Sequence, residues 1–208
     1  MSSLTLAVGR PTLADKVFSR SIATDLVLIA AGAALTAVAA QIAVPLWPVP
    51  ITGQTLAVLL VGVFLGATRG AASLALYAVL GIVGLPVFSD ASSGWHVVAG
   101  PTGGYIIGFV FAAAFTGWLA QREWDRKPVW AFLAFLVGSV IPFAFGLPWL
   151  AAALGNLGLD NSLGAVLQSG LYPFILGGVI KAALGAGIIS LAWFGVRRRD
   201  ARAESSAE

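Results

Sequence analysis

Long stretches without a charged side chain constrain the fold of this chain more than any other feature. Asp, Glu, Lys and Arg are all absent from residues 26–68, 70–89, 91–121, 128–159, 161–180 and 182–196. An apolar run of about 20 residues is long enough to cross the hydrocarbon core of a bilayer as a helix. Only 10% of the residues are charged, whereas a soluble domain carries about 25%. The sequence therefore predicts an all-α protein that crosses a membrane several times and is surrounded by lipid.

Proline, glycine and the few charges divide these runs into six predicted transmembrane helices. We place the helices at residues 23–44, 54–67, 71–85, 102–120, 129–150 and 173–196. The second and third helices are short for a complete crossing. We expect them to be tilted, or to be continued by irregular backbone that lines a cavity.

The distribution of basic residues supports six crossings. Eleven of the twelve Lys and Arg residues then fall on one side of the membrane, which the positive-inside rule makes the cytoplasm. We therefore expect residues 1–22 to be a cytoplasmic tail, 23–196 a six-helix membrane domain, and 197–208 a cytoplasmic tail that is basic and then disordered. The net charge of +3 follows from this topology, so we expect no nucleic-acid partner.

Several kinds of chemistry find no support in the sequence. The chain has no cysteine and a single histidine, His96, so we expect no metal site. A phosphate-binding loop would need a Gly-Lys-Ser/Thr sequence, which does not occur, so the chain should not hydrolyse ATP by itself. No nucleophile motif is present either. We expect a protein that is not an enzyme and holds no cofactor.

Lys181 is the one basic residue that lies on neither side of the predicted membrane. It follows Pro173, at the start of the sixth helix, by eight residues, which places it about 12 Å down the helix axis. A lysine close to a helix end can reach the headgroups, but its stem covers only about half of that depth. A cation at membrane depth costs about 2.5–3.5 kcal/mol on insertion scales, and such residues usually serve function. Since no acidic residue lies at a matching depth, an anionic ligand would supply the missing partner.

The three predicted outer loops hold most of the remaining polar side chains. Residues 89–96 are rich in hydrogen-bonding groups and read either as a solvated loop or as part of a binding site. Gln54, at the start of the second helix, is expected to cap that helix, to bond to another helix, or to contact a polar ligand. If a solute binds, we expect it to bind from the outer side.

Small residues mark two possible packing surfaces. Glycines at 177, 178, 185 and 187 surround Lys181 and allow close helix packing, or make room beside the lysine for a ligand. Alanines recur on the first helix with a spacing of four residues, which favours either packing inside the protein or contact with a partner protein. These alanines are Ala30, Ala33, Ala34 and Ala37.

Four motifs together resemble the BioY family, the biotin-binding S components of energy-coupling factor (ECF) transporters. They are Pro48-Val-Pro-Ile-Thr-Gly-Gln54, Gly84-Leu-Pro-Val-Phe88, Gly100-Pro-Thr-Gly-Gly-Tyr105 and Gly177-Gly-Val-Ile-Lys181. The resemblance extends over about residues 23–196, and the order and spacing of the four motifs make it specific. The resemblance implies a six-helix fold with a vitamin site near the extracellular side. It also implies partners, namely a transmembrane coupling protein and two cytosolic ATPases, which alone use ATP; self-association is the alternative.

The resemblance also implies roles for individual residues. Lys181 matches the lysine that binds the biotin carboxylate, Gln54 and Tyr105 match positions lining the pocket, and Ser92 falls where some members have an asparagine facing the ureido ring. Two positions depart from the family pattern: Gly178 replaces an aspartate that contacts the ureido ring, and Ile106 replaces an arginine.

These departures change the expected set of ligand contacts. The ureido contacts are expected from Asp90, Ser92, Ser93 or Gln54, with Trp95 and Tyr105 covering the rings. The resemblance thus implies biotin uptake across the plasma membrane. The alternatives are an S component for another anionic vitamin and a stand-alone secondary transporter.

Overall fold

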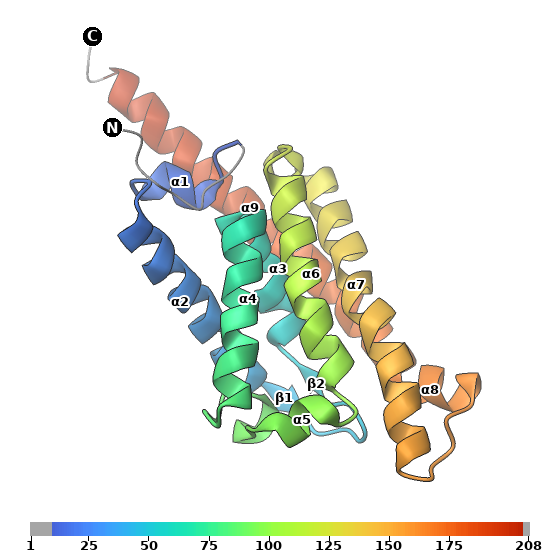
Figure 1. Ribbon diagram of the computed structural model, residues 1–208. Helices are drawn as coiled ribbons and strands as arrows, with labels where there is room; N and C mark the ends of the chain where they lie inside the picture. Colours follow the sequence, from blue (N-terminus) through green and yellow to red (C-terminus); the bar gives the residue numbers. More distant parts are fainter. Residues whose placement is uncertain (1–9, 206–208) are drawn as a thin grey trace.

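The computed structural model describes residues 10–205 and shows a bundle of helices (Figure 1). Within these residues, six helices of twelve residues or more form the bundle and alternate in direction along it. They are α2 (Ile22–Ala40), α3 (Gln54–Leu65), α4 (Ala67–Ile82), α6 (Gly103–Ala120), α7 (Pro128–Asn156) and α9 (Tyr172–Ser205). Both ends of the described chain, together with α1 (Leu13–Val17), lie at the upper end of the bundle in Figure 1, which we call the terminal end.

Short elements close the opposite end of the bundle, which we call the loop end. A two-stranded antiparallel hairpin pairs β1 (Ala43–Val44) with β2 (Ile51–Thr52) between α2 and α3. The short helices η1 (Ser89–Ala91) and α5 (Trp95–Ala99) connect α4 to α6, and α8 (Leu163–Gly170) connects α7 to α9. The backbone just before α3 is therefore irregular, which is why that helix is short.

Four helical stretches are long and apolar enough to cross a membrane by length and composition. Among the described residues these are 22–40, 103–120, 128–156 and 163–205, while α3 and α4 are shorter apolar helices. The predicted helices all exist, with shifted ends; the largest changes are the extension of α9 to Ser205 and of α7 to Asn156. Six membrane crossings and cytoplasmic termini stay predictions.

The structure continues a helix into the C-terminal tail, of which the residues after Arg202 were predicted to be disordered. The last helix, α9, continues through the arginines at 197–199 and Arg202 to Ser205, whereas residues 206–208 lie outside the described part. The physical reason is composition, because Arg, Ala and Glu are strong helix formers and predominate in this stretch. At the other end, the predicted tail contains the short helix α1, whose Leu13 and Ala14 are buried.

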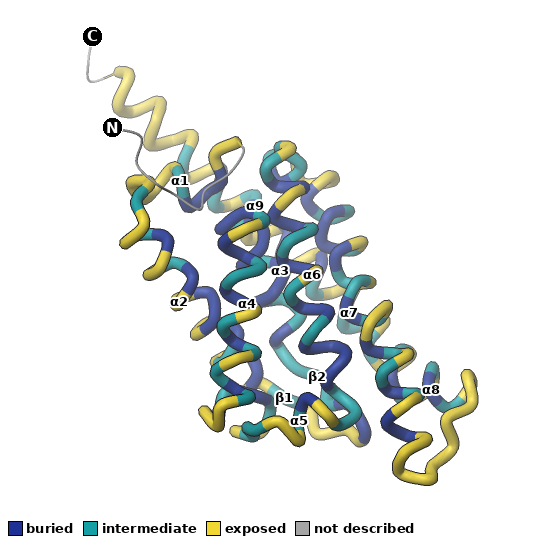
Figure 2. The backbone as a smooth tube through the Cα atoms, in the orientation of Figure 1, coloured by how far each residue is buried: buried dark blue, intermediate teal, exposed yellow. Residues whose placement is uncertain are grey.

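Many large apolar side chains are among the residues exposed on the bundle (Figure 2), as a lipid-facing surface requires. On α2, however, the four alanines do not share one environment. Ala33 is 2% exposed in the core and Ala37 packs against the same core, whereas Ala30 and Ala34 are exposed. Ala33 and Ala37 point toward the neighbouring helices of the bundle. Only Ala30 and Ala34, of the four alanines, are therefore exposed for contact with a partner.

Close approach of α3 and α6 depends on Gly62. A Cβ atom at this position would lie 2.3 Å from Thr116 Oγ1 and 2.4 Å from the backbone oxygen of Ala113. Backbone cannot move aside without shifting the helix, so only glycine fits. This contact holds together two helices whose far ends line the cavity described below.

We expect Gly62→Ala to destabilise the protein by about 1–3 kcal/mol, as overpacking of a core does. The matched control is Gly187→Ala on α9, where a Cβ would meet nothing within 4 Å. That change should be neutral or stabilising by up to about 1 kcal/mol, because alanine is the better helix former. Thermal unfolding in detergent measures both, and equal melting temperatures would contradict the close contact.

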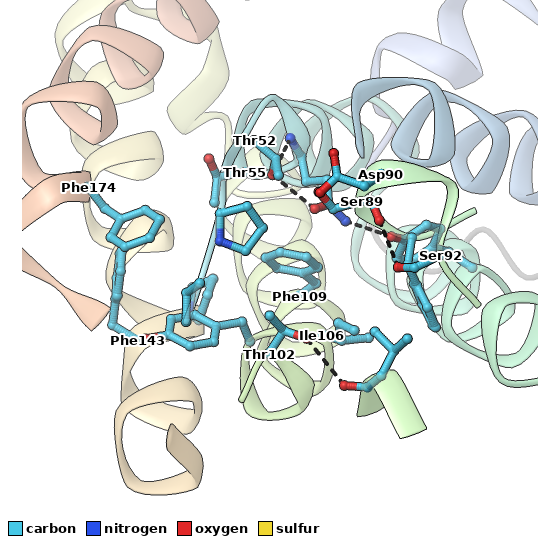
Figure 3. A pocket seen from close by; sticks show the side chains of 18 of the residues that line it. Thr52, Thr55, Ser89, Asp90, Ser92, Thr102, Ile106, Phe109, Phe143 and Phe174 are labelled. Carbon is cyan, nitrogen blue, oxygen red and sulfur yellow. Dashed lines mark hydrogen bonds between the residues drawn. The ribbon is translucent and has the colours of Figure 1, made fainter. Parts of the chain in front are cut away.

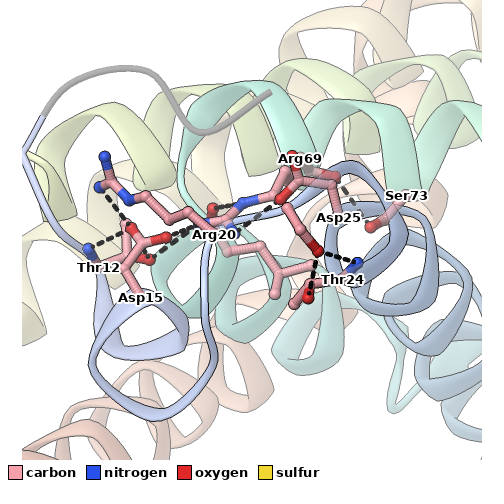
Figure 4. A network of polar contacts seen from close by, with 9 residues as sticks. Thr12, Asp15, Arg20, Thr24, Asp25, Arg69 and Ser73 are labelled. Atoms are coloured by element: carbon pink, nitrogen blue, oxygen red, sulfur yellow. Dashed lines mark hydrogen bonds and ion pairs between the residues drawn. The ribbon is translucent and has the colours of Figure 1, made fainter. Parts of the chain in front are cut away.

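A buried ion network ties α1 to the bundle at the terminal end (Figure 4). Arg69 on α4 lies 2.8 Å from Asp15 Oδ1 and 3.2 Å from Asp25 Oδ1, and all three side chains are at most 4% exposed. Burial alone would raise the pKa of Asp15, but hydrogen bonds from the Thr12 N–H, Arg20 and Arg69 hold that pKa below its ordinary value. The network thus explains a basic residue inside an apolar helix.

A third buried carboxyl group lies in the connection between α6 and α7. Asp125, in the short helix η2 (Trp124–Arg126), is 3% exposed and accepts a 2.6 Å hydrogen bond from Trp193 Nε1 on α9. Burial raises the pKa of Asp125 to about 6, although the Trp193 hydrogen bond and the charge of Arg126 act in the opposite direction. Folding therefore makes this group easier to protonate than it is in the unfolded chain.

This shift makes stability depend on pH in a definite direction. Because the folded-state pKa of Asp125 is the higher one, the contribution of this group to stability is greatest below about pH 4 and is lost as the pH rises through about 6. We expect Asp125→Asn, which keeps an acceptor for Trp193, to raise the melting temperature at pH 7.5. The gain should shrink as the pH falls from 6 toward 4. Asp200→Asn, at the exposed end of α9, is the control and should show no such gain; equal behaviour would contradict the burial effect.

Candidate functional site

A cavity of about 260 Å³ lies near the loop end of the bundle, where every long helix except α2 contributes a wall. Its size is close to the lower limit of small-molecule pockets, about 300–1,000 Å³. Aromatic side chains, including Phe143 and Phe174, lie on one side in Figure 3, and Ser89, Asp90 and Ser92 lie on the other. The cavity thus has an apolar side and a polar side.

Lys181 brings the one ammonium group into this cavity. Its Nζ donates hydrogen bonds to the backbone oxygen of Thr52 at 2.5 Å and to Thr55 Oγ1 at 2.9 Å. Within residues 10–205, no carboxylate oxygen lies within 4 Å of this nitrogen. An ammonium has three hydrogens to donate, so the two neutral oxygens leave one hydrogen and the whole charge for another partner.

Gln54 is buried at the first position of α3 and connects three elements. Its Oε1 accepts from Thr52 Oγ1 at 2.9 Å, and its Nε2 donates to the Tyr77 hydroxyl at 2.6 Å. The interhelical bond weighed from the sequence is therefore present, and the side chain also lines the cavity. A phenol that accepts one hydrogen bond still has its own hydrogen to donate, so Tyr77 presents a further donor.

The loop of residues 88–92 forms the polar side of the cavity. Phe88 is 2% exposed and places its ring edge-on against Tyr77, with ring centroids 5.5 Å apart. The hydroxyl oxygen of Ser89 is buried and has no hydrogen-bond partner among the described residues. A buried hydroxyl without a partner is costly, so Ser89 is suited to a polar ligand atom. Asp90 is exposed and lines the same cavity.

Aromatic rings give the cavity its apolar side. Tyr105 is buried, its hydroxyl donates to the Gly170 oxygen at 2.9 Å, and its ring meets Phe143 edge-on at 5.8 Å. Phe143 in turn meets Phe174 of α9 at 5.8 Å. Such ring contacts stabilise each other by about 0.5–1.5 kcal/mol beyond area burial. They hold a wall that would fit a flat or saturated ring system.

Most of the sequence-predicted site residues meet here, and some do not. Lys181, Gln54, Asp90, Ser92 and Tyr105 all line the cavity. Three predicted residues lie outside its lining: Ser93, Trp95, which is 63% exposed, and Gly178, which borders neighbouring grooves between α7 and α9.

Other lining residues were missed by the sequence reasoning. Thr52 and Thr55 hold Lys181 but are 129 and 126 residues away from it in the chain, so no local pattern links them. In the sequence, Ser89 looks like the other serines of the same loop. Only the burial of its hydroxyl oxygen in the structure distinguishes it. Gln54 and Tyr77 likewise meet only through packing.

Together, these features define a polytopic membrane protein with a cavity of nearly small-molecule size at the end opposite residues 10 and 205. Comparison with known proteins gives the family. The profile of the BioY family matches residues 10–198. The chain belongs to the BioY family and is a multi-pass protein of the cell membrane.

Curated relatives and a solved structure agree with this assignment. The biotin transporter BioY of Rhizobium etli is 38% identical over 146 residues, covering 67% of this chain and 75% of that protein. The biotin transporter BioY2 of Lactococcus lactis is 39% identical over 161 residues, covering 77% and 85%. These relatives are named as transporters, not as enzymes. The fold also matches the crystal structure of the S-component for biotin from an ECF-type ABC transporter, with a TM-score of 0.68, 24% identity, and coverage of 86% of this chain and 92% of that one.

Proposed function

We propose that this protein binds biotin and takes it up across the cell membrane, with Lys181 pairing with the biotin carboxylate. One observation carries this proposal: the Lys181 ammonium faces a ligand-sized cavity and, among residues 10–205, contacts only neutral oxygens there. A cation in a low-dielectric site gains most from a charged partner. The names of the relatives add the identity of the ligand.

The remaining cavity groups suit the neutral part of biotin. The ureido ring has two N–H donors and one carbonyl acceptor. Asp90 is an acceptor for the N–H groups, and the unpartnered Ser89 hydroxyl can donate to the carbonyl. The Ser92 hydroxyl donates its hydrogen to the Ser89 backbone oxygen at 2.7 Å, so it can only accept from an N–H group. The rings of Tyr105, Phe143 and Phe174 would cover the apolar bicycle and the aliphatic chain. In this arrangement the Ser89–Ser92 loop supplies the contacts that Gly178 cannot make.

The direction of uptake follows from the positions of the charges. The basic residues of both chain ends and of the α6–α7 connection gather at the terminal end, which supports placing that end in the cytoplasm. The cavity, at the loop end, would then receive biotin from outside.

The structural match to an S-component supports a role as the substrate-binding subunit of an ECF transporter. ATP would be used by partner subunits, namely two cytosolic ATPases joined through a transmembrane coupling protein. The exposed alanines Ala30 and Ala34 on α2 offer a smooth surface for a partner helix.

Equilibrium binding of biotin to the purified protein in detergent tests this proposal. We expect saturable binding of one biotin per chain, competed by biotin analogues that keep the ureido ring and the carboxylate. Failure to bind at micromolar biotin, with binding of another anionic vitamin instead, would overturn the substrate. Uptake by cells lacking the ATPase module, and its collapse on adding a protonophore, would instead show a stand-alone secondary transporter.

A further inference from the structure

A glutamine at the end of α2 bridges that helix to the cavity loop. Gln41 follows the last residue of α2, and its Nε2 donates to the backbone oxygens of Ala37 and Phe88, both at 3.0 Å. Its Oε1 accepts from the backbone N–H of Ala91 at 3.0 Å. One amide thus joins its own helix to both ends of the segment 88–91.

The bridged segment has a backbone that needs such support. Asp90 has a φ of 56° and Ala91 a φ of 53°, in the left-handed region that residues other than glycine rarely adopt. Conformations of this kind persist only where the surrounding structure holds them. Hydrogen bonds from the Phe88 N–H to the Ser92 oxygen, at 3.1 Å, and from Ser92 to the Ser89 oxygen close the turn on itself. Ala91 is exposed, and the hydrogen bond from its N–H to Gln41 ties the turn to α2.

The same segment separates the cavity from the outside. Phe88, Ser89 and Asp90 line the cavity; the Ser89 hydroxyl is buried, whereas Asp90 is exposed. On its other side Gln41 leads into the hairpin, where β1 pairs with β2 and the Thr52 oxygen accepts from Lys181. Gln41 therefore lies between the segment 88–91, which closes the cavity, and the hairpin whose strand β2 accepts the hydrogen bond from Lys181.

We propose that Gln41 is a latch: a positioning residue that holds the segment 88–91 across the cavity and thereby slows ligand release. A bound molecule leaves on this side only when the segment swings outward. That movement must break both hydrogen bonds between Gln41 and the segment. The identity of the released ligand rests on the proposed function, but the latch itself does not.

The test replaces Gln41 with methionine, which has a similar length but cannot make these hydrogen bonds. Release of labelled biotin, chased with excess unlabelled biotin, should become about tenfold faster. The melting temperature of the ligand-free protein should change little, because the side chain is exposed. The matched control is Gln168→Met, an exposed glutamine on α8 at the same end of the bundle, whose release rate should equal that of the wild type. An unchanged release rate in Gln41→Met would overturn the proposal.

A second measurement does not depend on biotin. In the ligand-free protein, amide hydrogen exchange at Ala91 should be faster in Gln41→Met than in the wild type or in Gln168→Met. If the wild type binds no biotin, the proposed function fails and this exchange alone decides the latch, with unchanged exchange as the contrary result. If biotin binds and exchange rises while release does not, the loop is held by Gln41 but is not the exit, and the latch is overturned.

Discussion

Biotin binding should weaken by about 10- to 100-fold when Lys181 is replaced by alanine. A hydrogen bond to a charged group contributes about 1.5–3 kcal/mol, and each 1.4 kcal/mol is about a factor of ten in affinity. The loss should fall almost entirely on the carboxylate. Biotin amide, which has the same rings and chain but no negative charge, should bind the variant and the wild type within about fivefold of each other.

The matched control is Lys127→Ala, at the opposite end of the bundle, where the side chain is exposed. It should leave the affinity for both ligands unchanged. Isothermal titration of the wild type and of Lys181→Ala, each with biotin and with biotin amide, gives a complete cycle of four affinities. Equal losses for biotin and its amide would show that Lys181 shapes the cavity without pairing with the carboxylate.

Replacing Arg69 with methionine should have the largest effect on stability, a loss of about 3–5 kcal/mol. The reason is the burial of the two carboxylates left behind, since Asp15 and Asp25 are at most 4% exposed and both lose their ion pair with the arginine. Unfolding in detergent, followed by tryptophan fluorescence against denaturant or temperature, measures the change.

The same substitution at Arg10 provides the control. Arg10 forms an ion pair with Glu123, but its side chain is 66% exposed, and exposed pairs contribute about 0–1 kcal/mol. Comparable losses from the two substitutions would contradict the buried network. A second signature is the pH dependence: since the pKa of Asp15 is held low in the folded protein, its stabilising contribution is present at neutral pH and lost as the pH falls through that pKa. Arg69→Met should weaken that acid dependence.

The sequence predicted the helices because their signals are local. Apolar length, proline and glycine positions and the spacing of charges set all six long helices, with their ends shifted by a few residues at most sites. The C-terminal tail was predicted to be basic and then disordered after Arg202, whereas α9 continues to Ser205, because Arg, Ala and Glu favour a helix.

Lys181 was predictable because a lone cation in an apolar run requires an explanation by itself. Its immediate partners were not, since Thr52 and Thr55 come from a hairpin and a helix more than 120 residues away. Ser89 and Gln41 were missed for a related reason. Ser89 is distinguished by its buried hydroxyl, and Gln41 by its contact with a left-handed turn. Neither feature produces a periodic pattern in the sequence.

The distance between the Lys181 nitrogen and the biotin carboxyl carbon tests the central claim most directly. The chain has only three lysines, Lys16, Lys127 and Lys181, so ¹⁵Nζ-lysine labelling with ¹³C-carboxyl biotin gives a simple solid-state NMR dephasing experiment, assigned with Lys181→Arg. An ion pair with an N–O distance of about 2.7–2.9 Å predicts an N–C distance below about 4 Å. Bound biotin whose carboxyl carbon shows no dephasing from any lysine nitrogen would contradict the pairing of this lysine with its cargo.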